Sequence, residues 1–291
     1  MTGRVSVTAE YMALFRALES ARPAGCRLFD DPFATSFLSQ RRKWLCGIAR
    51  VGVGRRIIER LLDWKAPGAR AAGIARTKWI DDEVTTALKK ASQLVLLGAG
   101  YDTRGLRLAA GRQLTTFELD QSATSVAKQV ALKRLLGSLP NNVRFVTVDF
   151  NKQLVVEALT GAGYNGTMPA CFVWEGVTNY LSADAVDNLL CQIRKAARGS
   201  LLLFSYIHRE VLENPEAFFG AKELMARLES YGEPWTFGFR PEELVGYLGA
   251  RGLRLVKDLS VAEAWRDAGR PAPELHGYEF YRLASARVED R

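Results

Sequence analysis

From residue 93 onward, short apolar runs alternate with longer segments of helical periodicity. The apolar runs are bounded by glycine or by charged residues, as strands buried on both faces of a sheet commonly are. Strands that alternate with helices indicate βαβ units, so the pattern predicts a mainly parallel sheet in an α/β fold. The predicted strands are 93–98, 114–120, 143–149, 170–175 and 200–206.

Two of the intervening helices can be read in more detail. Ser182 is in position to cap a helix, and Gly137 is in position to end one. We expect both helices to pack their apolar faces against the sheet. The first covers about 121–137, with Val126, Val130, Leu132 and Leu136 at helical spacing. The second follows Ser182, and its shared face carries Val186, Leu189, Leu190 and Ile193.

Three parts of the chain depart from this alternation. The first 90 or so residues read as helices without a strand, and 208–248 is helical with an interruption at 232–241. Both segments are expected over the carboxyl edge of the sheet, where open α/β folds bind ligands. The tail returns to strand patterns at 253–260 and 277–288, which predicts a closing antiparallel hairpin.

These patterns divide the chain into four parts. We expect helical additions around a Rossmann-like core, with no internal repeat. The parts are an N-terminal helical segment and lid (1–90), a cofactor-binding core (91–206), a helical substrate lid (207–250) and a C-terminal part of the core with an antiparallel strand pair (251–291).

The positive charge is concentrated in one stretch. The chain has 291 residues and a formal net charge of +8, and 41–70 contains nine basic residues against Glu59 and Asp63. Nucleic-acid binding faces usually interleave aromatic residues with basic ones, and this stretch offers only Trp44 and Trp64, so no nucleic-acid partner is expected. One interpretation is a solvated helical face, the other a rim that attracts an anionic substrate. In the first, the residues turned inward are Ile57, Ile58, Leu61 and Leu62.

Composition also bears on compartment and on metals. The first ten residues lack the apolar core of a signal peptide, and no apolar run approaches the roughly 18 residues of a membrane span. We therefore expect a cytoplasmic protein with no membrane partner. No CxxC pair occurs, so neither a zinc site nor a disulfide framework is predicted. The residues considered were Cys26, Cys46, Cys171, Cys191, His208 and His276.

The stretch LLGAGYDTRGL, residues 96–106, has the form of a nucleotide-binding loop between a strand and a helix. A dinucleotide fingerprint would place a third glycine where this chain has Thr103, which disfavours a nicotinamide or flavin dinucleotide. A ligand with an adenosine end and no pyrophosphate fits better. Asp120 ends the next predicted strand, where it can accept hydrogen bonds from ribose hydroxyls. Asp149 and Phe150 end the third, where they suit the edge and face of an adenine.

Several motifs in order give the chain a family resemblance. The segments ARTKWIDD (75–82), LLGAGYDTRGLRL (96–108), FELD (117–120), VDF (148–150) and EGVTNYL (175–181) resemble the leucine carboxyl methyltransferase family, in its bacterial branch of S-adenosylmethionine-dependent enzymes. The likeness extends over nearly the whole chain. It implies a class I methyltransferase sheet of seven strands with one antiparallel, helical additions, and S-adenosylmethionine as the cofactor.

The resemblance also implies roles for individual positions. The residue matching Arg76 pairs with the methionine carboxylate of the cofactor, the one matching Glu175 lies near its amino group, and the one matching Tyr180 touches the substrate carboxylate. His208 could act as a general base or be a structural histidine, and His276 has less to recommend it. The candidate catalytic residues are Tyr180, Glu175 and His208. The candidate cofactor-binding residues are Arg76, Gly98, Ala99, Gly100, Asp102, Thr103, Asp120, Asp149, Phe150 and Glu175.

The sequence therefore predicts an O-methyltransferase that esterifies a carboxylate on a peptide C-terminus or a natural-product intermediate. A carboxylate is ionised at neutral pH and needs no base, which suits a chain with two histidines. The oligomeric state is open, and a monomer is plausible. The alternatives are methylation of a hydroxyl or phenol in secondary metabolism, a nicotinamide-dependent oxidoreductase, and a catalytically inactive cofactor-binding protein.

Overall fold

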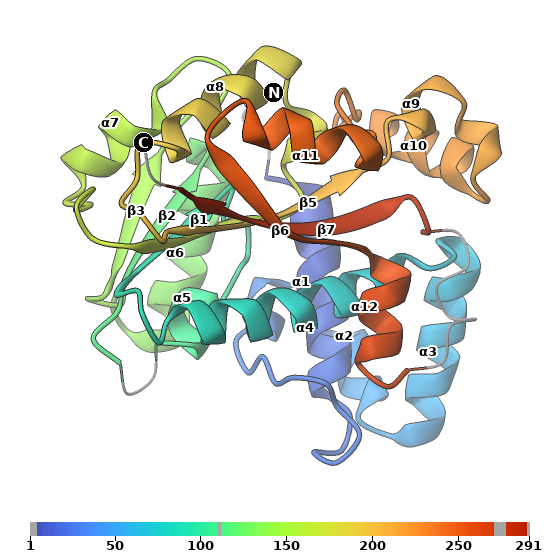
Figure 1. Ribbon diagram of the computed structural model, residues 1–291. Helices are drawn as coiled ribbons and strands as arrows, with labels where there is room; N and C mark the ends of the chain where they lie inside the picture. Colours follow the sequence, from blue (N-terminus) through green and yellow to red (C-terminus); the bar gives the residue numbers. More distant parts are fainter. Residues whose placement is uncertain (1–4, 110–111, 271–277, 290–291) are drawn as a thin grey trace.

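A seven-stranded sheet forms the centre of the computed structural model, which describes residues 5–109, 112–270 and 278–289 (Figure 1). The strand order is β3-β2-β1-β4-β5-β7-β6, and only β7 runs antiparallel to its neighbours. The predicted sheet, with seven strands and one antiparallel, is confirmed. The strands are β1 (Gln93–Leu97), β2 (Thr115–Asp120), β3 (Val143–Thr147), β4 (Ala170–Trp174), β5 (Leu201–Ile207), β6 (Leu253–Ser260) and β7 (Tyr281–Val288).

Helices make up the rest of the regular structure, and the described part of the first ninety residues contains helices and no strand. The α-helices are α1 (Val7–Ser20), α2 (Gln40–Ala49), α3 (Gly52–Lys65), α4 (Ala69–Ala87), α5 (Arg104–Arg107), α6 (Ser122–Leu136), α7 (Val155–Gly161), α8 (Ala183–Ile193), α9 (Glu210–Glu213), α10 (Ala221–Ser230), α11 (Pro241–Gly249) and α12 (Val261–Asp267). Three 3-10 turns accompany them: η1 (Ala34–Phe37), η2 (Thr178–Tyr180) and η3 (Pro215–Ala217).

Both faces of the sheet are covered, because β1, β4 and β5 are buried at every position. In β1, Val95 and Leu97 belong to the core beneath α7, α8 and α11, while Leu94 and Leu96 pack with α4 on the opposite face. Helices α4 and α12 lie together below the sheet, and α8 and α11 lie above it in Figure 1. Helix α11, which the sequence analysis included in the 207–250 insertion, thus packs on the sheet through Leu244.

The strand order reverses its direction of growth between β1 and β4, so the segments that follow these strands meet at one edge. The start of α1 reaches the same region, because Glu233 accepts a hydrogen bond from the backbone N–H of Val7 at 2.9 Å. The Thr236 N–H donates to the carbonyl of Asn179, in η2 after β4, at 2.7 Å. The beginning of the chain and the 233–236 segment therefore lie against the segment that follows β4.

One predicted helix is confirmed in detail and the other only in extent. The Ser182 side chain caps α8 by accepting from the N–H of Ala185, and all four predicted apolar residues of α8 are buried. Helix α6 ends before Gly137 as predicted, but its inward face was assigned wrongly. Leu132 is buried, whereas Val126, Val130 and Leu136 are exposed.

The error on α6 has an electrostatic cause. Lys128 lies on the inward face of α6 and is 1% exposed. Hydrophobic periodicity cannot identify such a position, because lysine is charged. Its ammonium lies 2.6 Å from the Glu118 carboxylate, which is buried on β2. A buried ion pair thus takes the place of an apolar contact between this helix and the sheet.

The two faces of α6 predict opposite responses to the same truncation. Leu132→Ala should lower the free energy of unfolding by about 2–5 kcal/mol, because it leaves a cavity among buried side chains. Val130→Ala should change it by less than about 0.5 kcal/mol, since 42% of this side chain is exposed. Urea unfolding of the two variants measures both values, and equal losses would contradict the helix orientation.

Candidate functional site

The turn after β1 is held against β2 by backbone hydrogen bonds. The carbonyl of Leu119 accepts from the N–H groups of Gly98 and Ala99 at 2.8 and 2.9 Å. Gly98 and Gly100 have φ angles of +73° and +46°, in the left-handed region that favours glycine. A Cβ on Gly98 would also collide with Val177, in the segment after β4. The Val177 side chain therefore packs directly against the backbone of the glycine turn.

Asp120 lies at the end of β2 and faces this turn. Its carboxylate accepts hydrogen bonds from the N–H groups of Gly100 at 2.5 Å and Gln121 at 2.7 Å. Burial raises the pKa of Asp120, although these backbone donors and Lys128 act in the opposite direction. An ionised carboxylate has room for about four hydrogen bonds. Asp120 can therefore accept further donors, such as the hydroxyl groups of a sugar.

Arg76 of α4 and Glu175 after β4 form an ion pair next to the turn. The Arg76 Nε lies 2.7 Å from Glu175 Oε1, and the guanidinium lies over the Tyr281 ring, 5.0 Å from its centroid. The Arg76 Nη2 donates to the sulfur of Met12 at 3.0 Å, which is a weak acceptor. The guanidinium is thus only partly satisfied, and a carboxylate would be a stronger partner for it.

Glu175 is shared between two arginines. Its second carboxylate oxygen accepts from Arg104 Nη1 at 2.6 Å. Burial raises the pKa of Glu175, but Arg104 and Arg76 outweigh it, and the net pKa lies below its ordinary value. The carboxylate therefore stays ionised at neutral pH and can hold an ammonium group.

Arg104 connects this pair to a larger buried network that the sequence analysis missed. It also contacts Asp102 at 2.5 Å and Asp81 at 2.7 Å. Burial opposes ionisation of Asp102, but Arg104 lowers its pKa to about 2. The network continues through ion pairs to the first helix. Its other members are Arg107, Asp31 and Arg16.

The Glu118–Lys128 pair lies directly behind the turn. Besides Glu118, the Lys128 ammonium donates to the carbonyl of Asp102 at 2.5 Å. Burial raises the pKa of Glu118 to about 7 even beside this ammonium. Lys128 thus ties the glycine turn to β2 and α6. In FELD only the last residue, Asp120, is a candidate from the sequence, and Glu118 gives no separate signal.

Tyr180 is surrounded by aromatic residues. It lies in η2, and burial, reinforced by Tyr281, raises its pKa above the ordinary value, so that the phenol stays protonated. Trp235 packs edge-on against Phe280 and Tyr281, at centroid distances of 5.8 and 6.2 Å. Tyr278 contacts both of these rings at 5.2 and 6.1 Å. We call Trp235, Tyr278, Phe280 and Tyr281 the aromatic cluster.

The aromatic cluster could have been suspected from its sequence. Its members come from the segments GEPWTF and GYEFYR, whose aromatic residues are dense. The periodicity of the second segment predicts only a strand. What it could not show is that the two segments meet beside Arg76.

His208 is poorly placed to take a proton from a substrate. Its Nδ1 accepts a hydrogen bond from the N–H of Glu210 at 3.2 Å, and its ring lies 5.9 Å from that of Phe218. In the neutral ring the proton is then on Nε2, which leaves no free lone pair for a base. The geometry thus favours the structural interpretation of His208. His276 lies outside the described residues.

The remaining candidates lie in different surroundings. Strand β3 ends at Thr147, so Asp149 lies two residues beyond it, half-exposed and 3.4 Å from Lys152. Phe150 is buried within the core rather than presented as an open face. Thr103 is buried and donates to Asp31 at 2.7 Å, which directs it into the ion-pair network.

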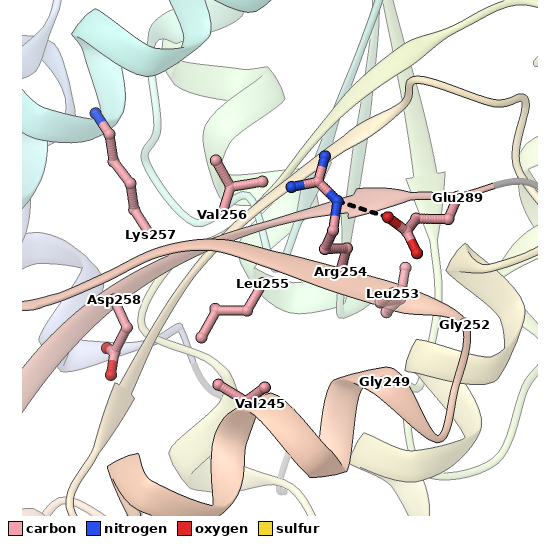
Figure 2. A pocket seen from close by; sticks show the side chains of 10 residues that line it. All are labelled: Val245, Gly249, Gly252, Leu253, Arg254, Leu255, Val256, Lys257, Asp258 and Glu289. Carbon is pink, nitrogen blue, oxygen red and sulfur yellow. Dashed lines mark hydrogen bonds and ion pairs between the residues drawn. The ribbon is translucent and has the colours of Figure 1, made fainter.

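A pocket of about 290 Å³ lies far from this region, between β6 and α11 (Figure 2). Arg254 and Glu289 form an ion pair of 2.5 Å on its wall. Strand β6 is the outermost strand, separated from β1 by β4, β5 and β7. This pocket therefore does not belong to the candidate site.

Three further properties concern metals, thiols and membranes. The four cysteines are free thiols. Within the described residues, His, Cys, Asp and Glu side chains form no group of three that could hold a metal ion. None of the described helices combines the length and the apolar character of a membrane span.

Comparisons with known proteins agree on one family. A family model described as leucine carboxyl methyltransferase matches residues 9–194. A predicted S-adenosyl-L-methionine-dependent methyltransferase from Mycobacterium sp. (strain KMS) is 30% identical over 276 residues, covering 87% of this chain and 85% of that protein. Another, from Streptomyces coelicolor, is 31% identical over 255 residues and covers 85% and 82%.

One solved structure shares the fold over nearly its full length. It is the crystal structure of a predicted methyltransferase from Thermobifida fusca, with a TM-score of 0.60 and 18% identity. The match covers 99% of this chain and 97% of that one.

The Glu118–Lys128 pair predicts a pH-dependent response to Lys128→Met. Without the ammonium, the folded-state pKa of Glu118 should rise further above 7, while its unfolded-state pKa stays near 4.5. The folded state then keeps a proton that the unfolded chain has lost, so stability falls as pH rises, by about 1.4 kcal/mol per pH unit. In the parent protein the free energy of unfolding stops falling near pH 7, where Glu118 also ionises in the folded state. The free energies of unfolding of the two proteins should therefore diverge from about pH 7 to about pH 9.

Urea unfolding over this pH range measures the divergence. The control is Glu118→Gln/Lys128→Met, which has no ionisable group at either position and should show no additional slope. A Lys128→Met variant whose stability runs parallel to that of the parent would contradict the assignment.

Proposed function

The chain belongs to the leucine carboxyl methyltransferase family, and from this we propose that it transfers the methyl group of S-adenosylmethionine to a carboxylate oxygen. Family membership makes it an S-adenosylmethionine-dependent methyltransferase. The carboxylate acceptor and the roles of individual residues are the proposal. The single observation that carries it is the Arg76–Glu175 pair beside the glycine turn, next to a protonated Tyr180.

The donor groups of the site suit each part of the cofactor. The methionine part carries a carboxylate and an ammonium, and Arg76 and Glu175 supply the opposite charges. The two side chains lie 2.7 Å apart, so one ligand that carries both charges can reach them together. Asp120 retains acceptor capacity for the ribose hydroxyls, and Gly98, Ala99 and Gly100 let the backbone approach. Asp102 and Thr103 would act indirectly, through the network that holds the turn.

The adenine would lie farther along the same edge, past β3. Asp149 is half-exposed there and can accept from an amino group. Phe150 is buried in the core, so its contribution would be to shape the floor of the site rather than to stack freely on a base.

The surroundings of Tyr180 support a carboxylate acceptor carried on an apolar body. A protonated phenol can donate a hydrogen bond to one carboxylate oxygen and leave the other free to react. The aromatic cluster next to it offers flat apolar surface to the rest of the acceptor, as ligand sites commonly do. A natural-product intermediate or a peptide C-terminus with a hydrophobic residue would both satisfy this chemistry.

The chemistry then requires alignment more than acid or base. The bound cofactor supplies a methyl group on a sulfonium, which is already activated. The protein's part is to hold the acceptor oxygen in line with that methyl group and to exclude water, and a well-oriented pair gains several orders of magnitude in rate. Tyr180 orients the acceptor, while Arg76 and Glu175 orient the donor. An ionised carboxylate gives up no proton, so no step depends on His208.

The same geometry weakens the alternatives. Methylation of a hydroxyl or phenol would need a base, and the Nδ1 of His208 is already engaged by a backbone N–H. A dinucleotide would need close approach at position 103, where the buried Thr103 side chain is bonded to Asp31. The intact arrangement of turn, carboxylates and Arg76 favours catalysis over a purely binding role.

The proposal predicts a specific loss on Asp120→Asn. An amide cannot accept from two ribose hydroxyls as a carboxylate does, so the Kd for S-adenosylmethionine should rise about tenfold or more. Isothermal calorimetry with the cofactor measures this, with the exposed Asp184 changed to Asn as the matched control. Unchanged affinity in Asp120→Asn would remove the ribose assignment.

The acceptor class is tested by product chemistry. The enzyme is incubated with methyl-labelled cofactor and a panel of aromatic and aliphatic carboxylic acids, peptides and phenols. Label that is released by mild base identifies a methyl ester. Base-stable label carried by the phenols alone would transfer the assignment to hydroxyl methylation.

Tyr180→Phe separates the acceptor from the cofactor. Loss of the hydroxyl should raise the acceptor KM about tenfold, because one hydrogen bond to a charged group is removed. The affinity for S-adenosylmethionine should stay unchanged. A variant with normal kinetics for every accepted acid would contradict the role of Tyr180.

A further inference from the structure

Helices α2 and α3 expose an unusual combination of large apolar and basic side chains. The exposed fractions reach 68% for Trp44 and 77% for Trp64. On α3, the apolar members follow one another at helical spacing and form a continuous stripe. The exposed apolar residues are Trp44, Val51, Val53, Ile57, Leu61 and Trp64. The exposed basic residues are Arg41, Lys43, Arg50, Arg56, Arg60 and Lys65. We call these twelve residues the α2–α3 face.

This face contradicts part of the expectation from sequence. Ile58 is buried and Leu62 is partly buried, as predicted for an inward face. Ile57 and Leu61 were predicted to turn inward as well, but they are 62% and 47% exposed. Helix α3 has more apolar positions than one side of a helix can bury, so the surplus faces outward.

The charge of the face is uncompensated. The two carboxylates of segment 41–70 are turned to other partners: Glu59 accepts from Arg22 at 2.6 Å and Asp63 from Arg70 at 2.7 Å. None of the six basic residues of the face lies within ion-pair distance of a carboxylate in the described part of the chain. The face therefore carries apolar and positive groups without negative ones.

We propose that the α2–α3 face docks the protein onto an anionic lipid surface. Basic residues beside exposed tryptophan and aliphatic side chains on a helix are the features of helices that lie in a membrane interface. The cations attract anionic headgroups, and the apolar stripe enters the boundary of the acyl chains. Such peripheral contact needs no spanning segment, and it revises the expectation from sequence that no membrane is a partner.

A second copy of the chain fits this face less well. A symmetric dimer would bring the same six cations of both copies together, and like charges at an interface cost several kcal/mol. The proposal concerns the outward side of α3, whereas Leu62 on its inward side packs against the core cluster that contains Phe280 and Tyr281. Figure 1 shows α3 at the right-hand margin, on the far side of the molecule from β1, β2 and β3.

The apolar part of the proposal is tested by co-sedimentation with vesicles. The full chain should bind vesicles of phosphatidylcholine with phosphatidylglycerol, and bind those of phosphatidylcholine alone much less. Ile57→Ser/Trp64→Ser should lower the bound fraction on the mixed vesicles at least tenfold. The matched control is Val126→Ser/Val245→Ser, which removes two valines of similar exposure elsewhere and should bind like the parent.

The electrostatic part is tested by charge reversal. Arg56→Glu/Arg60→Glu should weaken binding by at least about fivefold for each residue changed, and binding should fall with added salt. Lys89→Glu/Lys90→Glu alters the net charge equally at exposed positions on another part of the surface and should leave binding intact. Circular dichroism checks that each variant is folded.

Three outcomes would overturn the proposal. The first is no binding of the parent protein to mixed vesicles. The second is that Ile57→Ser/Trp64→Ser and Arg56→Glu/Arg60→Glu both bind mixed vesicles as well as the parent protein does. The third is a dimer of the parent protein in sedimentation without lipid that Ile57→Ser/Trp64→Ser dissociates, because the face would then be an interface between copies.

Discussion

A closed set of buried charges organises the region around the glycine turn. One chain of ion pairs runs through Arg16, Asp31, Arg107, Asp81, Arg104, Glu175 and Arg76. Asp102 joins it at Arg104. Removing one partner of such a pair commonly costs about 3–5 kcal/mol, because the other charge is left buried alone. The first helix, the fourth helix, the glycine turn and the segment after β4 are thereby fixed relative to one another.

Much of the fold could be predicted because its determinants are local. The strands are short apolar runs between breakers, and Ser182 caps its helix as its position suggests. Which face of α6 is turned toward the sheet could not be predicted, since the buried Lys128 is explained only by its ion pair with Glu118 on β2. On α3, periodicity gave the apolar positions, but which of them are covered depends on the neighbouring helices.

The candidate site was predictable to the extent that it follows strand ends. Asp120 and Glu175 each come at or directly after a strand, and parallel strands bring such positions to one edge. The aromatic cluster is different, because Trp235 and Tyr281 are far apart in sequence and meet only through the fold. Arg16, Arg104 and Arg107 of the buried network gave no signal either, since an arginine in a helix is usually a surface residue.

The location of Arg76 limits how the architecture can be divided. Helix α4 belongs by sequence to the N-terminal helical segment, yet it packs on the sheet and lends its guanidinium to Glu175. A fragment beginning at β1 would keep the whole glycine turn, but it would lose both Arg76 and Asp81 with α4. Glu175 would then lack one of its two arginines, and Arg104 and Arg107 would lack Asp81. The Rossmann-like core is thus not a self-sufficient module here, and any recombination between relatives should exchange α4 together with the sheet it covers.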